Sequence, residues 1–204
     1  MADRRGTIAI ETLTGAIDPA VFDALAELRI AVFRAFPYLY EGDLAYERDY
    51  LAALASARYA IIVTARDKAA DGRIVGCATG SALKGQHEEF AAPLLAAGRD
   101  AARTFYFGES VLLEAYRGRG IGHAFFDERE GWARSRGYER ASFCAVIRPD
   151  DHPSRPADHR PLDPFWRARG YRPIKGAIAQ FEWRDVDRAK VDAKPMQIWE
   201  RMLD

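Results

Sequence analysis

The segment Arg117-Gly118-Arg119-Gly120-Ile121-Gly122-His123 places three glycines between an extended apolar run and an amphipathic helix. The run covers residues 104–113, and the helical spacing of apolar side chains covers 121–136. A strand that turns through glycines into a helix leaves backbone N–H groups bare. These groups bind phosphate together with the positive end of the helix dipole. The segment therefore predicts a phosphate-binding loop with a strand before it and a helix after it.

Length and charge limit what can surround this loop. The chain has 204 residues, of which 49% are hydrophobic, which is enough for one sizeable core but little for two. The formal net charge of +0 gives no reason to expect nucleic acid as a partner. No apolar run approaches the roughly 20 residues of a membrane helix, and no signal-peptide core is present. We expect one domain over residues 1–204, located in the cytoplasm and bound to neither nucleic acid nor a membrane.

Hydrophobic periodicity predicts the elements along the chain. Asp18 and Asp43 are expected to cap two helices, and Pro37 should end the first of them near residue 35. Cys77 and Cys144 lie in apolar runs and are expected to be buried, reduced thiols. The expected strands are 7–14, 58–64, 73–83, 104–113, 140–147, 177–186 and 196–202. The expected helices are 19–35, 44–54, 121–136 and 163–169, and residues 86–98 are expected to form a short helical or irregular insertion. This order predicts an α+β fold.

Two common phosphate loops do not match the glycine segment. A P-loop needs a lysine and a hydroxyl after its last glycine, and neither stands there. A dinucleotide-binding fingerprint needs Gly-x-Gly-x-x-Gly, but the third glycine comes one residue too soon and His123 takes its place. A plain turn would need only one or two glycines with positive φ. The pattern that remains is Arg/Gln-x-x-Gly-x-Gly/Ala, which residues 117–122 match in full.

With this pattern and with the segment Phe165-Trp166-Arg167-Ala168-Arg169-Gly170-Tyr171, the chain resembles the GCN5-related N-acetyltransferase (GNAT) superfamily over nearly its whole length. The resemblance implies a three-layer α/β/α fold. Its sheet would be mixed, mostly antiparallel and twisted, with two splayed central parallel strands. The implied co-substrate is acetyl-CoA, and we expect no metal. The implied reaction is direct transfer of an acetyl group to a primary amine of a small molecule or to an exposed amino group of a polypeptide.

The same resemblance assigns residues to the cofactor. Backbone groups near Val111, Leu112 and Leu113 would hydrogen-bond the pantetheine amides in the gap between the splayed strands. Trp166 would pack against the pantetheine or against the hydrophobic core. The pyrophosphate would lie on the backbone N–H groups of the loop, with arginine side chains adding charge, so the expected phosphate-binding residues are Arg117, Gly118, Arg119, Gly120, Ile121, Gly122 and His123.

The expected general base is Glu109, a carboxylate inside an otherwise aromatic and aliphatic strand, where burial without a task is costly. The alternative is an ion pair between Glu109 and a neighbouring arginine. The other candidate bases lie on loops that could reach the acceptor side, namely Glu41, Asp43, His152 and His159. The family's general-acid tyrosine is replaced by Trp166, whose indole N–H is too weak an acid for this step. The proton donor therefore stays open between water, Ser110, Tyr171 and no dedicated acid.

The acceptor side is expected at the aromatic loop 36–42. Tyr38, Tyr40 and Glu41 would form one wall of the pocket, with His152 from the loop 149–161. Aromatic rings and a carboxylate suit a cationic or aromatic-bearing amine. The loop could equally be a hydrophobic staple between two helices. A non-catalytic acyl-CoA-binding or sensing module is the alternative to an enzyme, and the ends of the last strands could pair to form a homodimer.

Overall fold

The computed structural model describes residues 7–15, 17–84 and 88–204. Its strands form one seven-stranded sheet in the order β1-β2-β3-β4-β5-β7-β6. Neighbouring strands are antiparallel except β4 and β5, which are parallel. The strands are β1 (Ile8–Leu13), β2 (Ile61–Asp67), β3 (Arg73–Ala82), β4 (Thr104–Leu112), β5 (Arg140–Val146), β6 (Arg172–Arg184) and β7 (Val191–Met202).

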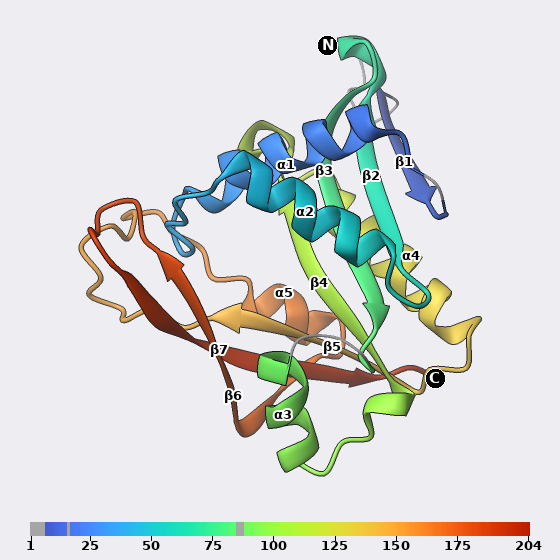
Figure 1. Ribbon diagram of the computed structural model, residues 1–204, viewed down its shortest axis with the longest axis vertical. Coiled ribbons are helices and arrows are strands. Elements are labelled where there is room, and N and C mark those ends of the chain that lie inside the picture. Colours follow the sequence, from blue (N-terminus) through green and yellow to red (C-terminus); the bar gives the residue numbers. More distant parts are fainter. Residues whose placement is uncertain (1–6, 16, 85–87) are drawn as a thin grey trace.

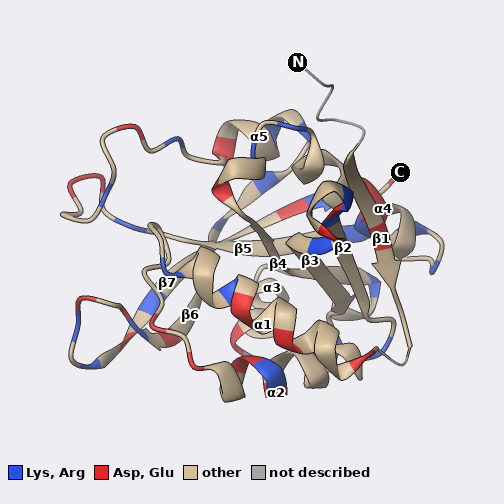
Figure 2. Ribbon diagram, turned by 90° about the horizontal axis from the view of Figure 1, so that it is seen from above, with Lys and Arg blue, Asp and Glu red and all other residues tan. Residues whose placement is uncertain are grey.

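Helices cover both faces of the sheet. α1 (Pro19–Phe33) and α2 (Leu44–Ala55) lie on one face, and α4 (Ile121–Arg134) and α5 (Asp163–Ala168) lie on the other (Figure 1, Figure 2). The short helix α3 (Glu88–Ala96) packs against β6, where the ring of Phe90 contacts Phe181. This arrangement confirms the three-layer α+β fold. Among the residues that the structure describes, short 3₁₀ turns lie at Lys68–Ala70, Ala101–Arg103 and Glu114–Tyr116.

The helix boundaries follow from their caps. The carboxylate of Asp18 accepts from the amide of Ala20 at 2.9 Å, and that of Asp43 accepts from the amide of Tyr46 at 2.9 Å. Both caps satisfy amides that have no partner inside the helix, so both helices begin where the sequence indicates. Gly137, at φ 75°, follows the end of α4 in the left-handed conformation that glycine adopts without strain.

Three strand boundaries differ from expectation. β2 begins at Ile61 and not at residue 58, because Tyr59 has φ 57° and the chain turns there. β6 begins at Arg172, five residues before the expected start, although its first part contains Pro173 and a register shift follows that proline. β7 likewise begins at Val191, where charged residues hide the alternation. The last two strands are therefore a longer hairpin than their apolar pattern indicates.

The two parallel strands separate after a short stretch of pairing. β4 and β5 pair only from Thr104 opposite Arg140 to Tyr106 opposite Ser142. Beyond this point β4 stays paired with β3 as far as Leu112, and β5 stays paired with β7 as far as Val146. The strands diverge in Figure 1, and this confirms the expected splay. It leaves the edge of β4 from residue 107 to residue 112 without a strand neighbour on the β5 side.

A β-bulge changes which way the end of β4 faces. Ala78 opposes Ser110 and Gly80 opposes Phe107, so Thr79 stands opposite both Gly108 and Glu109. A Cβ atom at Gly108 would lie 2.6 Å from the Thr79 hydroxyl, so only glycine fits at this position. The extra residue reverses the alternation of the strand. Phe105 and Phe107 pack on the α4 face, whereas Val111 and the Glu109 carboxylate face α1 and α2.

Charged residues of both signs occur throughout the fold. Basic and acidic residues are interspersed along the helices, strands and loops and do not gather on one face (Figure 2). Within the described ranges, none of the helices combines the length and the hydropathy that a membrane span requires. Cys77 and Cys144 are buried free thiols.

Candidate functional site

The glycine loop has the backbone that phosphate binding needs. Gly118 and Gly120 have φ values of 74° and 81°, which side chains rarely adopt. Gly120 is the N-cap residue of α4 and supplies no side-chain cap, so the amides of the first turn stay available. A Cβ atom built at either glycine meets no atom within 4 Å, so open space lies over the loop. These residues fit a pyrophosphate group, and their role stays a prediction.

The two arginines of the loop differ in their contacts. Arg119 donates to the carbonyl of Ala115 at 2.8 Å, and its guanidinium lies 4.8 Å from the ring centroid of Tyr116. Arg117 is exposed and forms no ion pair with any residue that the structure describes. Arg117 is therefore the arginine whose donors are available to an anion.

The edge of β4 offers fewer backbone groups than expected. The amide of Leu113 donates to the carbonyl of Val75 at 2.9 Å, so it points toward β3 and away from the gap. Backbone groups alternate in direction along a strand, so Ser110 and Leu112 are the residues whose groups face the β5 side. The expectation that the Leu113 amide is free is wrong. Val111 contributes a buried side chain to the α1–α2 face of the core.

Glu109 lies in a buried ionic cluster below the aromatic loop. Its Oε1 lies 2.5 Å from Nη1 of Arg29, and its Oε2 accepts from the Tyr50 hydroxyl at 3.2 Å. Arg29 also pairs with Glu47, and all three charged residues are less than one-tenth exposed. Burial lowers the pKa of Arg29, but the charges of Glu109, Tyr50 and Glu47 outweigh this and raise it. The ion pair of the alternative interpretation is present, and the role of Glu109 as a base stays a prediction.

Ser110 projects from the opposite face of β4, where Arg129 holds it. The guanidinium of Arg129 donates to the Ser110 hydroxyl at 2.8 Å and to the carbonyls of Thr79 and Glu109 at 3.0 and 3.1 Å. Arg129 is only 1% exposed, and burial lowers its pKa to about 10. Sequence reasoning missed this residue. Its position between Phe125 and Ala133, one turn from each, was the available signal, because an arginine there interrupts the buried stripe of α4.

The structure brings both histidines of the loop 149–161 to the aromatic loop. The ring centroid of Phe36 lies 4.8 Å from that of His159 and 5.7 Å from that of His152. Burial lowers the pKa of His159, and the positive charges of Arg155 and Arg117 add to this. Because Arg117 belongs to the glycine loop, the imidazole of His159 feels the charge of that loop while its ring contacts the aromatic loop. His152 is held by the amide of Ser154, which donates to Nδ1 at 3.2 Å.

The aromatic residues of the loop 36–42 line the cluster around Glu109. Burial raises the pKa of Tyr38, and the charges of Cys144 and Glu109 add to this shift. Burial also raises the pKa of Tyr40, with Glu47 as the next cause. The Tyr38 ring contacts Phe33 of α1 at 4.6 Å, so part of the loop does staple the helix. Glu41 is paired with Arg34 at 3.0 Å.

Arg148 fixes the path of this loop and was also missed. It donates to the backbone carbonyls of Pro37 and Tyr38, both at 2.8 Å, and to both carboxylate oxygens of Asp185 at 2.8 and 2.9 Å. Burial raises the pKa of Asp185, but the hydrogen bonds and charge of Arg148, followed by the charge of Lys194, outweigh burial. The pKa of Asp185 is therefore lowered. These contacts of Arg148 with Pro37, Tyr38 and Asp185, which we call the Arg148 clamp, join the aromatic loop, the end of β5 and the β6–β7 hairpin.

Three further expected residues lie around α5. The Trp166 ring centroid is 5.1 Å from those of Phe143 and Trp199, so the indole packs against the core. The Nδ1 atom of His123 is 3.2 Å from Nη1 of Arg169, so its ring faces α5. Tyr171 is fully buried and donates its hydroxyl to Glu130 at 3.1 Å.

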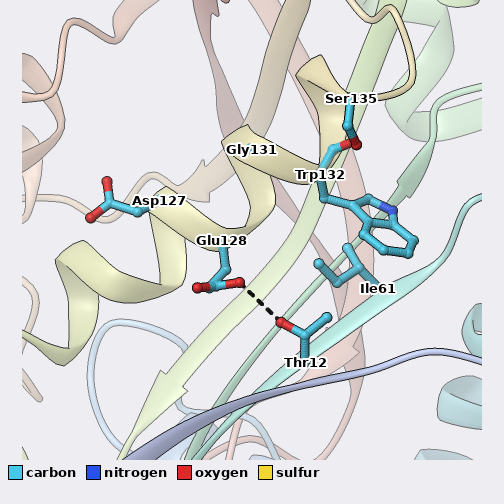
Figure 3. Close-up of a pocket in the computed structure, with 7 residues that line it drawn as sticks. All are labelled: Thr12, Ile61, Asp127, Glu128, Gly131, Trp132 and Ser135. Carbon is cyan, nitrogen blue, oxygen red and sulfur yellow. Dashed lines mark hydrogen bonds between the residues drawn. The ribbon is translucent and has the colours of Figure 1, made fainter.

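A surface depression of about 390 Å³ lies between α4 and the strands β1 and β2, and shares no residue with the glycine loop or β4. Figure 3 shows Asp127, Glu128, Gly131 and Trp132 along its helical side, with Glu128 accepting from Thr12 at 3.1 Å. Its residues belong to neither of the expected binding sites. Among the described residues, no group of three or more His, Cys, Asp or Glu side chains is placed to hold a metal ion.

Comparisons with known proteins agree with this fold. The sequence model of the acetyltransferase (GNAT) family matches residues 23–157. No curated protein sequence matches the chain. Similar solved structures include a ribosomal-protein-alanine N-acetyltransferase from Brucella melitensis, with 14% identity, 96% of this chain and 99% of that chain covered, and a TM-score of 0.60.

Two further solved structures are similar over the same length. A GCN5-related N-acetyltransferase from Kribbella flavida has 16% identity, with 96% of this chain and 98% of that chain covered and a TM-score of 0.58. A GNAT superfamily phosphinothricin acetyltransferase from Sinorhizobium meliloti, in complex with AcCoA, has 17% identity, with 97% and 89% covered and a TM-score of 0.56. At these identities the structures show a shared fold. Together with the family match over two thirds of its length, they establish that the chain belongs to the acetyltransferase (GNAT) family.

Proposed function

We propose that the chain is an N-acetyltransferase that transfers an acetyl group from acetyl-CoA directly to a primary amine of a small molecule or to an exposed amino group. The observation that carries this proposal is the splay of β4 and β5 beside the glycine loop. It places an unpaired strand edge next to bare helix amides, which suits a ligand with amides at one end and phosphates at the other. The related structure from Sinorhizobium meliloti holds AcCoA.

The chain's own residues would divide the work of binding. The amides of residues 118–123 and the free side chain of Arg117 would hold the phosphates, and the backbone of Ser110 and Leu112 would bind the pantetheine amides. Acetyl-CoA, when bound, supplies a thioester whose acyl carbon reacts with an amine. Tyr38, Tyr40, Glu41 and His152 would contact the acceptor. The rings of Tyr38 and Tyr40, together with the carboxylates of Glu41 and of the buried cluster around Glu109, favour a cationic or aromatic-bearing amine.

The alternative is a non-catalytic acyl-CoA-binding or sensing module. Two observations favour it: Glu109 is neutralised by Arg29, and Trp166 stands where the family has its acidic tyrosine. A homodimer formed through the exposed edge of β6 also stays a proposal.

Release of free thiol from acetyl-CoA, measured against a panel of amines, separates the two functions. The panel contains polyamines, aminoglycosides, aromatic amines and peptides with free N-termini. We expect amine-dependent thiol release with at least one class, and the cationic and aromatic members should react fastest. Tight coenzyme A binding in calorimetry together with no release on any amine would favour the binding module.

Replacement of Glu109 by glutamine tests the base. We expect kcat/KM to fall by about 10²- to 10⁴-fold, the usual contribution of a general base, and the acidic limb of its pH profile to disappear. Glu139→Gln removes an exposed carboxylate paired with Arg103 and serves as the control with wild-type turnover. Wild-type turnover and an unshifted profile in Glu109→Gln would move the role to His159, whose replacement by alanine should then cause the loss.

A further inference from the structure

Arg129 is a buried cation without an anionic partner. It is 1% exposed, and no carboxylate among the described residues forms an ion pair with it. Its guanidinium instead donates to backbone carbonyls and to the Ser110 hydroxyl, and it lies 4.2 Å from the ring centroid of Phe107. Burying a charge that no opposite charge neutralises is costly, so a neutral side chain would be preferred if packing were its only role.

Part of its role is to hold the β-bulge. The carbonyls of Thr79 and Glu109 stand on the two sides of the bulge, and Nη1 of Arg129 donates to both. A neutral donor could satisfy these oxygens as well. The positive charge therefore needs a second explanation, and the remaining bond, from Nη2 to Ser110, provides it.

Ser110 faces the gap between the splayed strands. It is exposed although β4 is an interior strand and both chain neighbours, Glu109 and Val111, are buried. An interior strand position reaches solvent only where the next strand has moved away, and pairing with β5 has ended at Tyr106. Because the Ser110 oxygen accepts from Arg129, the hydroxyl hydrogen is directed away from the guanidinium. The pair thus presents one polarised O–H donor to the gap.

We propose that Ser110 and Arg129 form one unit that stabilises negative charge on the sulfur of coenzyme A bound in this gap. The inference rests on the proposed function. In the transfer, the bond between the amine nitrogen and the acyl carbon forms as the carbon–sulfur bond breaks. The electron pair of that bond stays on sulfur, and the amine gives its proton to the base on the acceptor side. Ser110 donates a hydrogen bond and keeps its proton, Arg129 positions and polarises it, and the thiolate takes its proton from water.

This unit would take the place of the general-acid tyrosine of the family, which is replaced by Trp166 in this chain. Stabilising the thiolate by a fixed donor and a buried charge makes protonation of sulfur unnecessary during bond cleavage. The acidic groups around the unit raise the pKa of Arg129 from a distance, but none of those that the structure describes pairs with its guanidinium. Burial raises the pKa values of the Cys77 thiol on β3 and the Tyr171 hydroxyl after α5, so both stay neutral. The carboxylates of Glu109 on β4 and Glu130 on α4 are held by other arginines, namely Arg29, Arg169 and Arg201.

Calorimetry with two ligands tests the unit without any turnover. Coenzyme A and desulfo-coenzyme A share the same phosphates and differ only in the thiol, so their affinity ratio isolates the sulfur. If the bound thiol has a pKa lowered by about one unit from its usual value near 8.5, coenzyme A gains about 8-fold in relative affinity between pH 6 and pH 9. Affinity rises with pH because the complex then carries fewer protons than the free ligand. Ser110→Ala and Arg129→Met should each remove this gain.

The chain supplies a matched control at the C-terminal end of α4. There Arg136 donates to the Ser135 hydroxyl at 2.8 Å, the same pair of groups away from the gap. Ser135→Ala and Arg136→Met should keep the wild-type ratio at both pH values. An unchanged gain in Ser110→Ala, a small substitution at an exposed position, would overturn the inference even if Arg129→Met does not fold. Equal binding of both ligands by the wild-type protein at both pH values would also overturn the inference, but it would leave the proposed function intact. Failure of the wild-type protein to bind either ligand would instead refute the cofactor site itself.

Discussion

Replacement of Gly120 by glutamate is expected to lower the affinity for coenzyme A by about 100-fold or more. Gly120 has φ 81°, where a side chain costs about 1–2 kcal/mol, and it begins α4 with no side-chain cap. The new side chain would enter the open space over the loop. Its carboxylate would compete with phosphate for the helix amides and repel it. Calorimetric titration with coenzyme A measures the loss.

Gly131→Glu is the matched control for this substitution. Gly131 lies on the same helix, has no positive φ, and a Cβ atom there meets no atom within 4 Å. The same change of charge at this site should leave coenzyme A affinity unchanged, since the position faces β1 and β2 in a depression that shares no residue with the glycine loop. Equal affinity of the Gly120→Glu variant and the wild type, with both folded by circular dichroism, would mean that the loop does not bind the phosphates.

Replacement of Arg29 by methionine is expected to lower the free energy of unfolding by about 3–5 kcal/mol, the usual cost of leaving a buried charge unpaired. The carboxylates of Glu47 and Glu109 are 1% and 9% exposed and would face each other without the guanidinium. Methionine keeps most of the apolar stem that packs near Phe33 and Tyr50, so the loss reports charge more than packing. Urea denaturation at pH 7 measures it.

Arg48→Met provides the comparison on the surface. Arg48 pairs with Asp23 at 2.6 Å, but both side chains are about half exposed, so its loss should cost no more than about 1 kcal/mol. Replacing Glu47 and Glu109 by glutamine in the Arg29→Met background should recover part of the stability. Equal losses in Arg29→Met and Arg48→Met would show that the buried cluster contributes no more than a surface pair.

Local features of the chain account for much of this architecture. Helix caps, apolar periodicity and glycine spacing are short-range properties, and they place α1, α2, α4 and the glycine turn before α4 correctly. The splay between β4 and β5 was expected because the family resemblance implies it. Local patterns fail where pairing partners decide the outcome. The bulge at Gly108 and Glu109 depends on the register with β3, and alternation alone would put Glu109 on the face of Phe105 and Phe107.

The site is less readable from sequence than the fold, because its side chains come from distant positions. Arg148 and Asp185 are 37 residues apart, and each follows the end of a different strand. No sequence spacing therefore predicts that they form an ion pair. Arg29 lies 80 positions before Glu109, on helix α1. From the sequence we could predict that an arginine pairs with Glu109, but not which arginine. Arg129 did leave a trace, a charge at a buried helical position, and such breaks of pattern are where functional residues are best sought.

The Arg148 clamp separates the shape of the aromatic loop from its side chains. Arg148 bonds to the backbone carbonyls of Pro37 and Tyr38, and the Trp183 indole donates to the Tyr38 carbonyl as well at 3.0 Å. Carbonyls are present whatever the residue, so exchanges at positions 38, 40 and 41 would leave these bonds in place. The backbone of the loop is thus held independently of its side chains. Substitutions at these positions, in evolution or in directed libraries, can change the acceptor preference without changing the fold.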